Sequence, residues 1–347
     1  MPAAIFFTFV EIGLMKRFLK SDVTVIGSGS WATAIVKMLS ANCDHICWFI
    51  NDRPTLQHIR RHNQNPHYLS SVSFKPGKLI LTDNINRAVA SSPVIILVTP
   101  SQYLKSALDN LAYPLENKIV CTAIKGIVPE QNIVVGEYIH NYYLVPYEGI
   151  VVLTGPSHAE EVAMEKLTYI TLASAEKESA RRVASLIKNP YVRTVISDDI
   201  FGTEYAAIMK NIYAIGAGIC IGLGYGDNFL AVLLSNAANE MKRFIDIKHP
   251  THRDVNSSAY LGDLLVTGYS QFSRNRVFGA MIGKGYSVKN ALLEMTQVAE
   301  GYPSAGCINE IALREGMDLP IATTVYKILY EGASPSKEIV NLSKQLI

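Results

Sequence analysis

The sequence predicts an α/β protein with two domains, an N-terminal doubly wound and mainly parallel sheet followed by an all-α C-terminal domain. Three observations support this prediction. Short apolar runs alternate with helical patterns in the first half of the chain, a glycine-rich turn joins the first run to the first helix, and helical patterns alone follow residue 197. The 347 residues suit two domains, because a domain usually takes about 100–200 residues.

Seven apolar runs in the first half are the predicted strands. The first five are mainly apolar, as expected for strands buried on both faces of a parallel sheet. Their alternation with helical patterns implies βαβ units and a doubly wound sheet. The runs cover residues 22–26, 46–50, 94–98, 119–122, 150–153, 169–173 and 192–196.

The change of pattern after residue 197 sets the predicted domain boundary. Residues 21–197 form the predicted sheet domain and residues 198–347 the predicted helical domain. Residues 1–20 are interpreted as an N-terminal extension, with Met15 as an alternative start because a strand follows it closely. The first 14 residues lack the basic region and cleavage site of a secretory signal, and they are too short to span a bilayer.

One long helix is predicted over residues 201–219. Four isoleucines form one stripe of it, and small residues surround Lys210, so the helix should be buried on both sides. The uncharged stretch after Lys210 is interrupted by glycines and ends at Asp227, which is short of the roughly 18–20 apolar residues that a membrane span needs. We therefore expect no stable membrane insertion.

Charge and cysteine content narrow the partners. A formal net charge of +2 is too small to indicate nucleic acid or an anionic membrane, and it favours a small-molecule partner. Five cysteines, an odd number in mostly apolar surroundings, are typical of free thiols in a reducing compartment. Neither a CxxC nor an HExxH spacing occurs, so we predict no metal.

A dinucleotide fingerprint follows the first predicted strand. Gly27, Gly29 and Ala32 form a GxGxxA pattern that opens an apolar helix and includes Ser30 and Trp31. The first glycine makes the tight turn, the second lets the backbone approach a pyrophosphate, and the small third residue packs helix on strand. The helix N-terminus offers unpaired N–H groups to the phosphates. This context predicts a Rossmann-like domain that binds NAD or NADP.

The choice between NAD and NADP stays open. It normally depends on an acid after the second strand, which binds the ribose 2′-hydroxyl, or on an arginine that accommodates a 2′-phosphate. Here the second strand is followed by Asn51, Asp52 and Arg53. Both charges lie near enough to act, and either could be a solvated loop charge. Asn51 and Arg53 are the candidates for cofactor contact.

Further motifs in one order along the chain resemble the NAD(P)-dependent glycerol-3-phosphate dehydrogenase family of bacterial type. They are GSGSWATA from Gly27, NQNPHYL at 63–69, TPSQ at 99–102, IKG at 124–126, GPSHAEEV at 155–162, KN at 210–211, GAGICIGLGYGDN ending at Asn228, GDL at 262–264, SRNR at 273–276 and VAEG at 298–301. Ala32, Ser70 and Ser304 depart from the family's usual glycine, proline and threonine. Alanine is an accepted variant in the third fingerprint position.

The resemblance implies an activity and its residues. Such enzymes interconvert sn-glycerol 3-phosphate and dihydroxyacetone phosphate by hydride transfer. Lys210 would be the general acid and base, with Lys125 and Asp263 as catalytic partners. The implied substrate contacts are Lys125, Gly155, Ser157, Lys210, Asn211, Asp263, Thr267, Ser273, Arg274 and Asn275. The implied cofactor contacts are Gly27, Gly29, Ser30, Trp31, Asn51, Arg53, Lys125, Ala159, Arg274, Val298 and Glu300.

Elementary chemistry is compatible with these roles. Burial and a neighbouring cation lower the pKa of a lysine toward working pH, and a guanidinium suits phosphate. Taken alone, Lys210 would more often be a lysine whose stem covers apolar surface, and Asp263 a helix cap. The resemblance further implies a cytoplasmic, homodimeric enzyme that supplies phospholipid synthesis. Its rivals are a β-hydroxyacid or sugar-acid dehydrogenase and a non-catalytic NAD(P)H-binding redox sensor.

Overall fold

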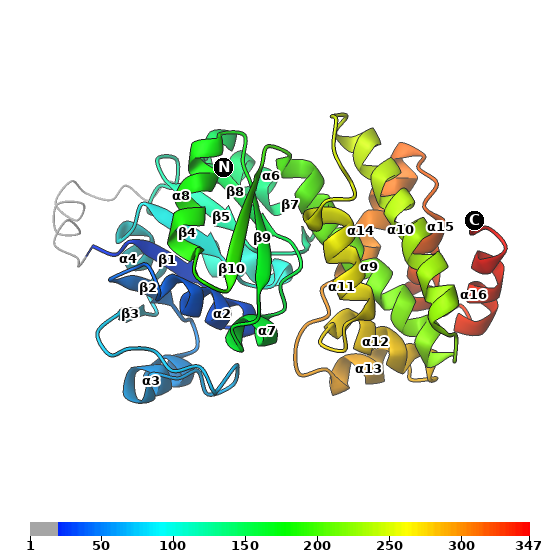
Figure 1. Ribbon diagram of the computed structural model, residues 1–347, viewed down its shortest axis with the longest axis horizontal. Helices are drawn as coiled ribbons and strands as arrows, with labels where there is room; N and C mark the ends of the chain where they lie inside the picture. Colours follow the sequence, from blue (N-terminus) through cyan, green and yellow to red (C-terminus); the bar gives the residue numbers. More distant parts are fainter. Residues whose placement is uncertain (1–19) are drawn as a thin grey trace.

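The structure, a computed structural model, describes residues 20–347. The alternative start at Met15, and all of the predicted extension except residue 20, lie outside the described residues. Figure 1 shows a sheet domain next to a helical domain that ends at the C-terminus. The predicted fold class, a mainly parallel sheet followed by helices, is confirmed.

Within residues 20–347 the main sheet has eight strands, in the order β10-β9-β8-β5-β4-β1-β2-β3. Every neighbouring pair is parallel except β8 and β9. β1 lies between β2 and β4, so the strand order reverses beside β1, which is where open α/β sheets bind ligands. The bounds are β1 Val23–Ile26, β2 Ile46–Phe49, β3 Leu79–Thr82, β4 Val94–Leu97, β5 Ile119–Thr122, β8 Ile150–Thr154, β9 Thr168–Ala173 and β10 Val192–Ser197.

All seven predicted strands are present, and each of their ends lies within one residue of the prediction. The sequence analysis missed β3, which is an edge strand with three of its four residues only partly buried. It also missed a small antiparallel hairpin of two residues per strand, β6 Ile127–Val128 and β7 Ile133–Val134. β6 and β7 are too short to give an apolar run, whereas the run LILT of β3 is as long as the predicted run at 119–122 and was not assigned to a strand.

Helices cover both faces of the sheet, as a doubly wound fold requires. One apolar core joins the sheet to α2, α3, α7 and α8, and a second core joins the other face to α4, α5 and α6. Figure 1 shows α2 and α8 over one side of the sheet. The bounds are α2 Ser30–Leu39, α3 Arg53–His62, α4 Ile85–Ala90, α5 Leu104–Leu108, α6 Val135–Tyr143, α7 Ala159–Ala163 and α8 Lys177–Ile187, with 3₁₀ turns η1 Ser101–Tyr103 and η2 Tyr147–Gly149.

The helical domain follows β10, so the predicted boundary at 197/198 falls between β10 and α9. A short π-helical segment, η3, directly precedes α11. The bounds are α9 Ile200–Gly222, α10 Asp227–Lys248, η3 Ser258–Gly262, α11 Asp263–Tyr269, α12 Arg274–Gly283, α13 Val288–Glu294, α14 Gly301–Glu315, α15 Pro320–Tyr330 and α16 Pro335–Ser343.

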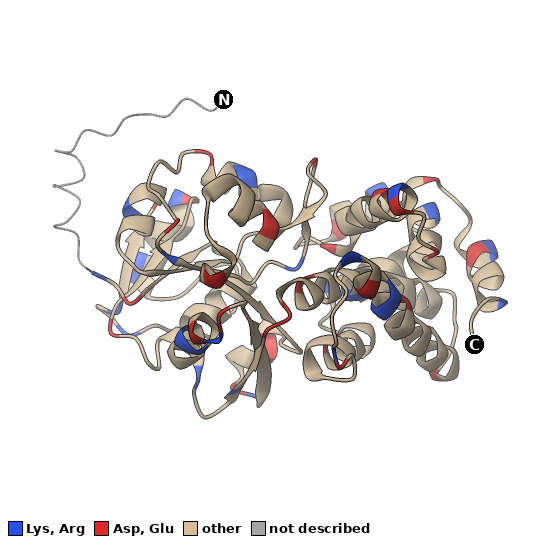
Figure 2. Cartoon of the chain, turned by 90° about the horizontal axis from the view of Figure 1, so that it is seen from above, with Lys and Arg blue, Asp and Glu red and all other residues tan. Residues whose placement is uncertain are grey.

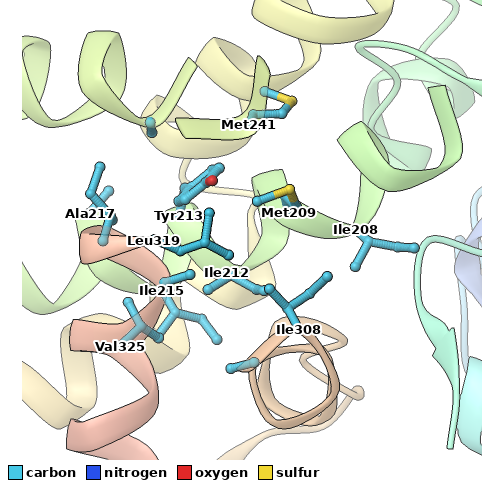
Figure 3. Packing of buried hydrophobic residues seen from close by; sticks show 14 of the residues in the cluster. Ile208, Met209, Ile212, Tyr213, Ile215, Ala217, Met241, Ile308, Leu319 and Val325 are labelled. Carbon is cyan, nitrogen blue, oxygen red and sulfur yellow. The ribbon is translucent and has the colours of Figure 1, made fainter. Parts of the chain in front are cut away.

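α9 forms the centre of the helical domain. It is longer than the predicted helix by one residue at its start and three at its end, and it packs against α10, α11, α12, α14 and α15. Figure 3 shows Ile212 of α9 with Ile308 of α14, and Ile215 with Val325 of α15. By length and composition α9 could cross a membrane, but 89% of its most apolar window is buried within the protein. α9 is therefore a core helix.

Figure 2 shows that positions with Lys or Arg and positions with Asp or Glu are spread over both domains. Most described ion pairs lie on the surface, where each contributes about 0–1 kcal/mol. A much more deeply buried group of charges lies between the two domains and contains Lys125, Lys210 and Asp263.

Candidate active site

A cleft of about 800 Å³ separates the two domains. Its sheet-domain wall comes from the turn after β1 and from the segments after β2, β4, β5 and β8, where the carboxyl ends of the strands lie. Its helical-domain wall comes from α9, α11, the start of α12 and the segment before α14. The volume is in the usual range for a cofactor site, roughly 300–1,000 Å³, and interdomain clefts are common places for such sites.

The fingerprint turn has the backbone geometry that its glycines predict. Gly27 has φ +127°, and a Cβ atom there would lie 2.5 Å from the Val98 carbonyl oxygen, so a side chain does not fit. A Cβ at Gly29 would meet nothing within 4 Å, which leaves open space above the start of α2. The indole nitrogen of Trp48 donates to the Gly27 carbonyl over 2.6 Å and holds the turn. The predicted contacts Gly27, Gly29, Ser30 and Trp31 all line the cleft.

The turn fits a dinucleotide on two further observations. Gly29 is the N-cap of α2 and has no side chain to cap it, so the N–H groups of the first turn stay available for an anion. The Trp31 indole nitrogen is buried in the cleft wall without a hydrogen-bond partner among the described residues. From the 63–69 motif, Asn65 donates to the Ser28 carbonyl and to Thr33 Oγ1 and so supports the turn from behind.

In the segment after β2, the two candidates for cofactor contact, Asn51 and Arg53, differ in whether they line the cleft. Asn51 lines the cleft. Asp52 is the N-cap of α3, where its carboxylate accepts from the Thr55 N–H over 2.8 Å. The Arg53 side chain is 80% exposed, pairs with Asp83 at 2.9 Å and is not part of the cleft wall. The structure thus places Asn51 at the cleft and both charged neighbours in other contacts.

Lys210 and Asp263 form a buried ion pair at the base of the cleft. Lys210 lies in the middle of α9 and Asp263 is the first residue of α11, and their side chains are only 5% and 1% exposed. Lys210 Nζ donates to Asp263 Oδ1. Lys125, after β5, lies with its Nζ 3.7 Å from Asp263 Oδ2 and 3.4 Å from the Gly155 carbonyl. Two cations from different domains therefore share one carboxylate.

This arrangement perturbs the proton affinity of Lys210. Burial is the largest cause and lowers the pKa of Lys210 to about 7, because the charged form loses hydration. The value of about 7 includes a smaller lowering by Lys125 and the opposite effect of Asp263. Burial would raise the pKa of Asp263, but Lys125 and then Lys210 hold it below its ordinary value. The carboxylate stays ionised, and Lys210 can exchange a proton near neutral pH.

The start of α12 carries the predicted phosphate contacts. Ser273 is its N-cap and accepts from the Arg276 N–H, and Asn275 accepts from the Gly301 N–H over 2.9 Å. Arg274 donates to Gln297 over 2.6 Å. All three predicted residues line the cleft together with Thr267, whose hydroxyl donates to the Asp263 carbonyl. A guanidinium and a helix N-terminus that face one cleft suit an anion.

Some predicted residues lie at the edge of the cleft or behind its wall. Gly155, with φ +106°, does not line the cleft, but its carbonyl accepts from Lys125 and from the Ser157 hydroxyl. Ser157 and Ala159 do line it. The Asn211 amide donates to the Lys125 carbonyl over 3.0 Å and thereby joins the two domains.

Glu300 and Val298 reach the cleft from the segment before α14. The Glu300 carboxylate accepts from both the Ser101 N–H at 3.0 Å and the Ser101 hydroxyl at 2.8 Å. Burial raises the pKa of Glu300. Glu300 therefore connects the helical domain to the segment after β4 at the rim of the site.

Gln297 and His158 are two residues of this wall to which the sequence assigned no role. The Gln297 side-chain carbonyl accepts from Ser30 of the fingerprint and from Arg274 of α12, so it bridges the dinucleotide turn and the anion-binding end of the cleft. His158 lines the cleft between Ser157 and Ala159. The contact between Gln297 and Ser30 joins residues that are distant in sequence, so no local pattern predicts it. His158 belongs to the motif at 155–162, which was the one sequence signal for either residue.

Comparison with known proteins decides the family. The model named NAD-dependent glycerol-3-phosphate dehydrogenase N-terminus matches residues 22–180, and its C-terminal counterpart matches residues 199–340. The chain belongs to this family. The predicted resemblance is thereby confirmed, and this family of oxidoreductases has the two-part organisation of the chain, a Rossmann-type sheet and a helical region.

Individual relatives agree with the family models. The chain is 34% identical over 326 residues to the glycerol-3-phosphate dehydrogenase (NAD(P)+) of Lactobacillus johnsonii, which covers 92% of this chain and 96% of the relative. The solved glycerol-3-phosphate dehydrogenase of Coxiella burnetii superposes with a TM-score of 0.86 at 26% identity, over 93% of this chain and 98% of that one. A D-mandelate dehydrogenase superposes with a TM-score of 0.59 at 15% identity, over 91% of this chain and 99% of that one, which shows a shared fold alone.

Proposed function

We propose that this protein is an NAD(P)-dependent sn-glycerol-3-phosphate dehydrogenase that interconverts dihydroxyacetone phosphate and sn-glycerol 3-phosphate, with Lys210 as general acid and base. The observation that carries the proposal is the buried Lys210–Asp263 pair beside the fingerprint turn in one cleft. Family membership and the names of the relatives supply the substrate. A bound nicotinamide supplies or accepts the hydride.

Lys210 handles the proton. In reduction, its ammonium donates a proton to the substrate's carbonyl oxygen as the carbonyl carbon gains the hydride, and a secondary alcohol results. In oxidation, the neutral amine takes the hydroxyl proton as the hydride leaves. A pKa of about 7 makes both forms of Lys210 available near neutral pH, which is where general acid–base catalysis is most effective.

Asp263 and Lys125 prepare this step. The Asp263 carboxylate accepts from Lys210 Nζ and so fixes the direction of the amine. Lys125 keeps that carboxylate ionised and adds a positive charge near the position where the carbonyl oxygen becomes negative. The start of α12 holds the phosphate through Arg274, Ser273 and Asn275.

Turnover is the direct test. Purified protein is mixed with dihydroxyacetone phosphate and either NADH or NADPH, and loss of the reduced nicotinamide's absorbance is followed. We expect turnover with at least one cofactor, which a non-catalytic sensor would not give. No turnover with either would refute the proposal, and faster turnover of β-hydroxyacids or their keto forms would favour the rival dehydrogenase.

Lys210→Met tests the assigned acid and base. Loss of the amine should reduce kcat by at least about a hundredfold, because general acid–base help contributes roughly a hundred- to ten-thousandfold. The dissociation constant for the reduced cofactor should stay within about twofold. Lys118→Met is the matched control, because burial also lowers the pKa of Lys118, which lies outside the cleft wall. Near-normal kcat in Lys210→Met would refute the role.

Cellular role and assembly extend the proposal. A homodimer in the cytoplasm that supplies sn-glycerol 3-phosphate to phospholipid synthesis agrees with the family resemblance and with five free cysteines, four of them buried. Light scattering on the purified protein would test the dimer. Rescue of cells that cannot make sn-glycerol 3-phosphate would test the metabolic role.

A further inference from the structure

His158 stands in the cleft wall at a point where the two domains approach each other. It is the N-cap residue of α7, three residues after Gly155. Its ring centroid lies 6.1 Å from that of Phe272, which lines the helical side of the same cleft. His158 is thus held on the sheet domain and faces the helical domain.

The ring has an unused hydrogen-bonding atom. His158 Nε2 is buried and has no hydrogen-bond partner among residues 20–347. Buried polar atoms nearly always have a partner, and one without it destabilises the fold unless a ligand or water completes it. Three side chains of the cleft wall carry such atoms, Trp31, His158 and Asp263, and the other two lie at the fingerprint turn and at the proposed proton-transfer pair.

The charges around His158 keep its ring neutral. Burial, then Lys210 and then Lys125 lower the pKa of His158, while Asp263 and a hydrogen bond with the Val266 backbone act in the opposite direction, and the net result is a pKa of about 4. A neutral imidazole has one donor and one acceptor nitrogen. It therefore suits a hydroxyl group, which both donates and accepts, better than a dianionic phosphate.

The proposed substrate has three polar groups, and two already have partners of suitable charge. The phosphate faces the guanidinium and helix N-terminus of α12, and the carbonyl oxygen faces Lys210. The hydroxyl of the hydroxymethyl group remains. His158 lines the same cleft as Lys125, Lys210 and Asp263, and the hydroxymethyl carbon is bonded directly to the carbonyl carbon, so this hydroxyl lies in the part of the cleft that the ring can reach.

We propose that His158 is a specificity-determining residue whose Nε2 hydrogen-bonds the hydroxymethyl hydroxyl of the substrate. The inference rests on the proposed function, which supplies the substrate. A site built to hydrogen-bond a substrate hydroxyl discriminates against the analogue that lacks it, because a buried polar atom is then left unpaired. His158 would thus distinguish dihydroxyacetone phosphate from its 1-deoxy analogue, in which a methyl group replaces the hydroxymethyl group.

Two substrates and two variants test the contact. His158→Phe keeps an aromatic ring beside Phe272 and removes both nitrogens, whereas His158→Gln retains a donor and an acceptor. In His158→Phe, kcat/KM for dihydroxyacetone phosphate should fall about tenfold to a hundredfold, as for the loss of one buried hydrogen bond. The value for the 1-deoxy analogue should stay within about twofold of wild type. For dihydroxyacetone phosphate, kcat/KM of His158→Gln should be at least about threefold higher than that of His158→Phe.

The control is His140→Phe, the same substitution at a histidine that stacks on Tyr147 outside the cleft wall. It should leave the preference between the two substrates unchanged. An equal loss on both substrates in His158→Phe would mean a structural role and overturn the inference, and so would no loss on either. His158→Leu gives the same comparison should the phenylalanine variant not fold. Failure of wild type to turn over dihydroxyacetone phosphate would instead refute the proposed function.

Discussion

Replacing Asp263 by asparagine tests the electrostatics of the cleft most directly. The substitution preserves shape at a side chain that is 1% exposed and removes the negative charge that Lys210 contacts. Asp263 is the largest influence that raises the pKa of Lys210 against burial and Lys125. Without that charge, we expect the pKa of Lys210 to fall below its value of about 7.

The size of the shift follows from the lost interaction. A hydrogen bond to a charged group contributes about 1.5–3 kcal/mol. Since one pKa unit corresponds to about 1.4 kcal/mol, the pKa of Lys210 should fall by about one to two units. The fall is limited to this range because the asparagine side-chain carbonyl can still accept a hydrogen bond from the amine. This bond replaces part of the lost Coulomb attraction.

The assay is the pH dependence of kcat/KM in both directions, because this ratio reports groups of the free enzyme. Reduction needs protonated Lys210, so its rate falls as pH rises through the pKa. Oxidation needs the neutral amine, so its rate rises through the same pKa. In Asp263→Asn both midpoints should move to lower pH by about one to two units. The substrate phosphate also titrates near pH 6, but it does so equally with wild type and variant.

The midpoint of each pH profile, not the absolute rate, decides the outcome. Asp263 also contacts the proposed substrate site, so its loss lowers the rate at every pH. Asp83→Asn is the control, because Asp83 belongs to an exposed ion pair with Arg53 and does not line the cleft. Midpoints that stay fixed or move to higher pH in Asp263→Asn would contradict the assignment of Lys210 as the titrating group.

Three further predictions concern the cofactor turn and a buried acid. Gly29→Ala should keep the wild-type melting temperature, because its Cβ meets no atom within 4 Å, yet raise the dissociation constant for NADH at least about tenfold by fluorescence titration; unchanged affinity would refute pyrophosphate binding there. Asp83→Ala frees the Arg53 guanidinium and should strengthen NADPH binding relative to NADH by about threefold to tenfold, and an unchanged ratio would separate Arg53 from cofactor choice. Burial raises the pKa of Glu204 to about 8, so its stabilising protonated form is fully present below pH of about 4.5 and is lost as pH rises through 8. In urea unfolding, the free energy of unfolding of Glu204→Gln should therefore rise relative to that of wild type by up to about 4 kcal/mol between pH 5 and 9. A difference between the two proteins that does not change with pH would contradict a protonated Glu204.

The sheet could be predicted because its information is local. Each buried parallel strand is a short apolar run, so its ends appear in the sequence to within one residue. The edge strand β3 was not predicted, although its sequence LILT is an apolar run as long as that of β5. The antiparallel pairing of β8 with β9 was not predicted, because an apolar run does not reveal in which direction its strand runs relative to the neighbouring strand. The turn at Gly27 was predictable because strand, glycines and helix are contiguous.

The proposed catalytic pair could not be predicted from local pattern. Lys210 and Asp263 are 53 residues apart and meet only because α11 packs on α9. Physics alone favoured a lysine with its stem on apolar surface and a capping aspartate, and only the family resemblance brought the two together. Gln297 was missed because its contact with Ser30 joins positions 267 residues apart, and glutamine belongs to no motif that the sequence displays.

The proton affinity of Lys210 depends on both domains at once. α9 and α11 of the helical domain supply Lys210 and Asp263, but the sheet domain supplies Lys125, which lowers the pKa of both. Lys125 is held in turn by the Asn211 amide on its carbonyl and by the Gly155 carbonyl on its amine. A change in domain separation would alter the distance between Lys125 and Asp263 and with it the proton affinity of Lys210. The interdomain contacts at the cleft, including Ser101 with Glu300, therefore influence the proton affinity of Lys210 as well as the shape of the site.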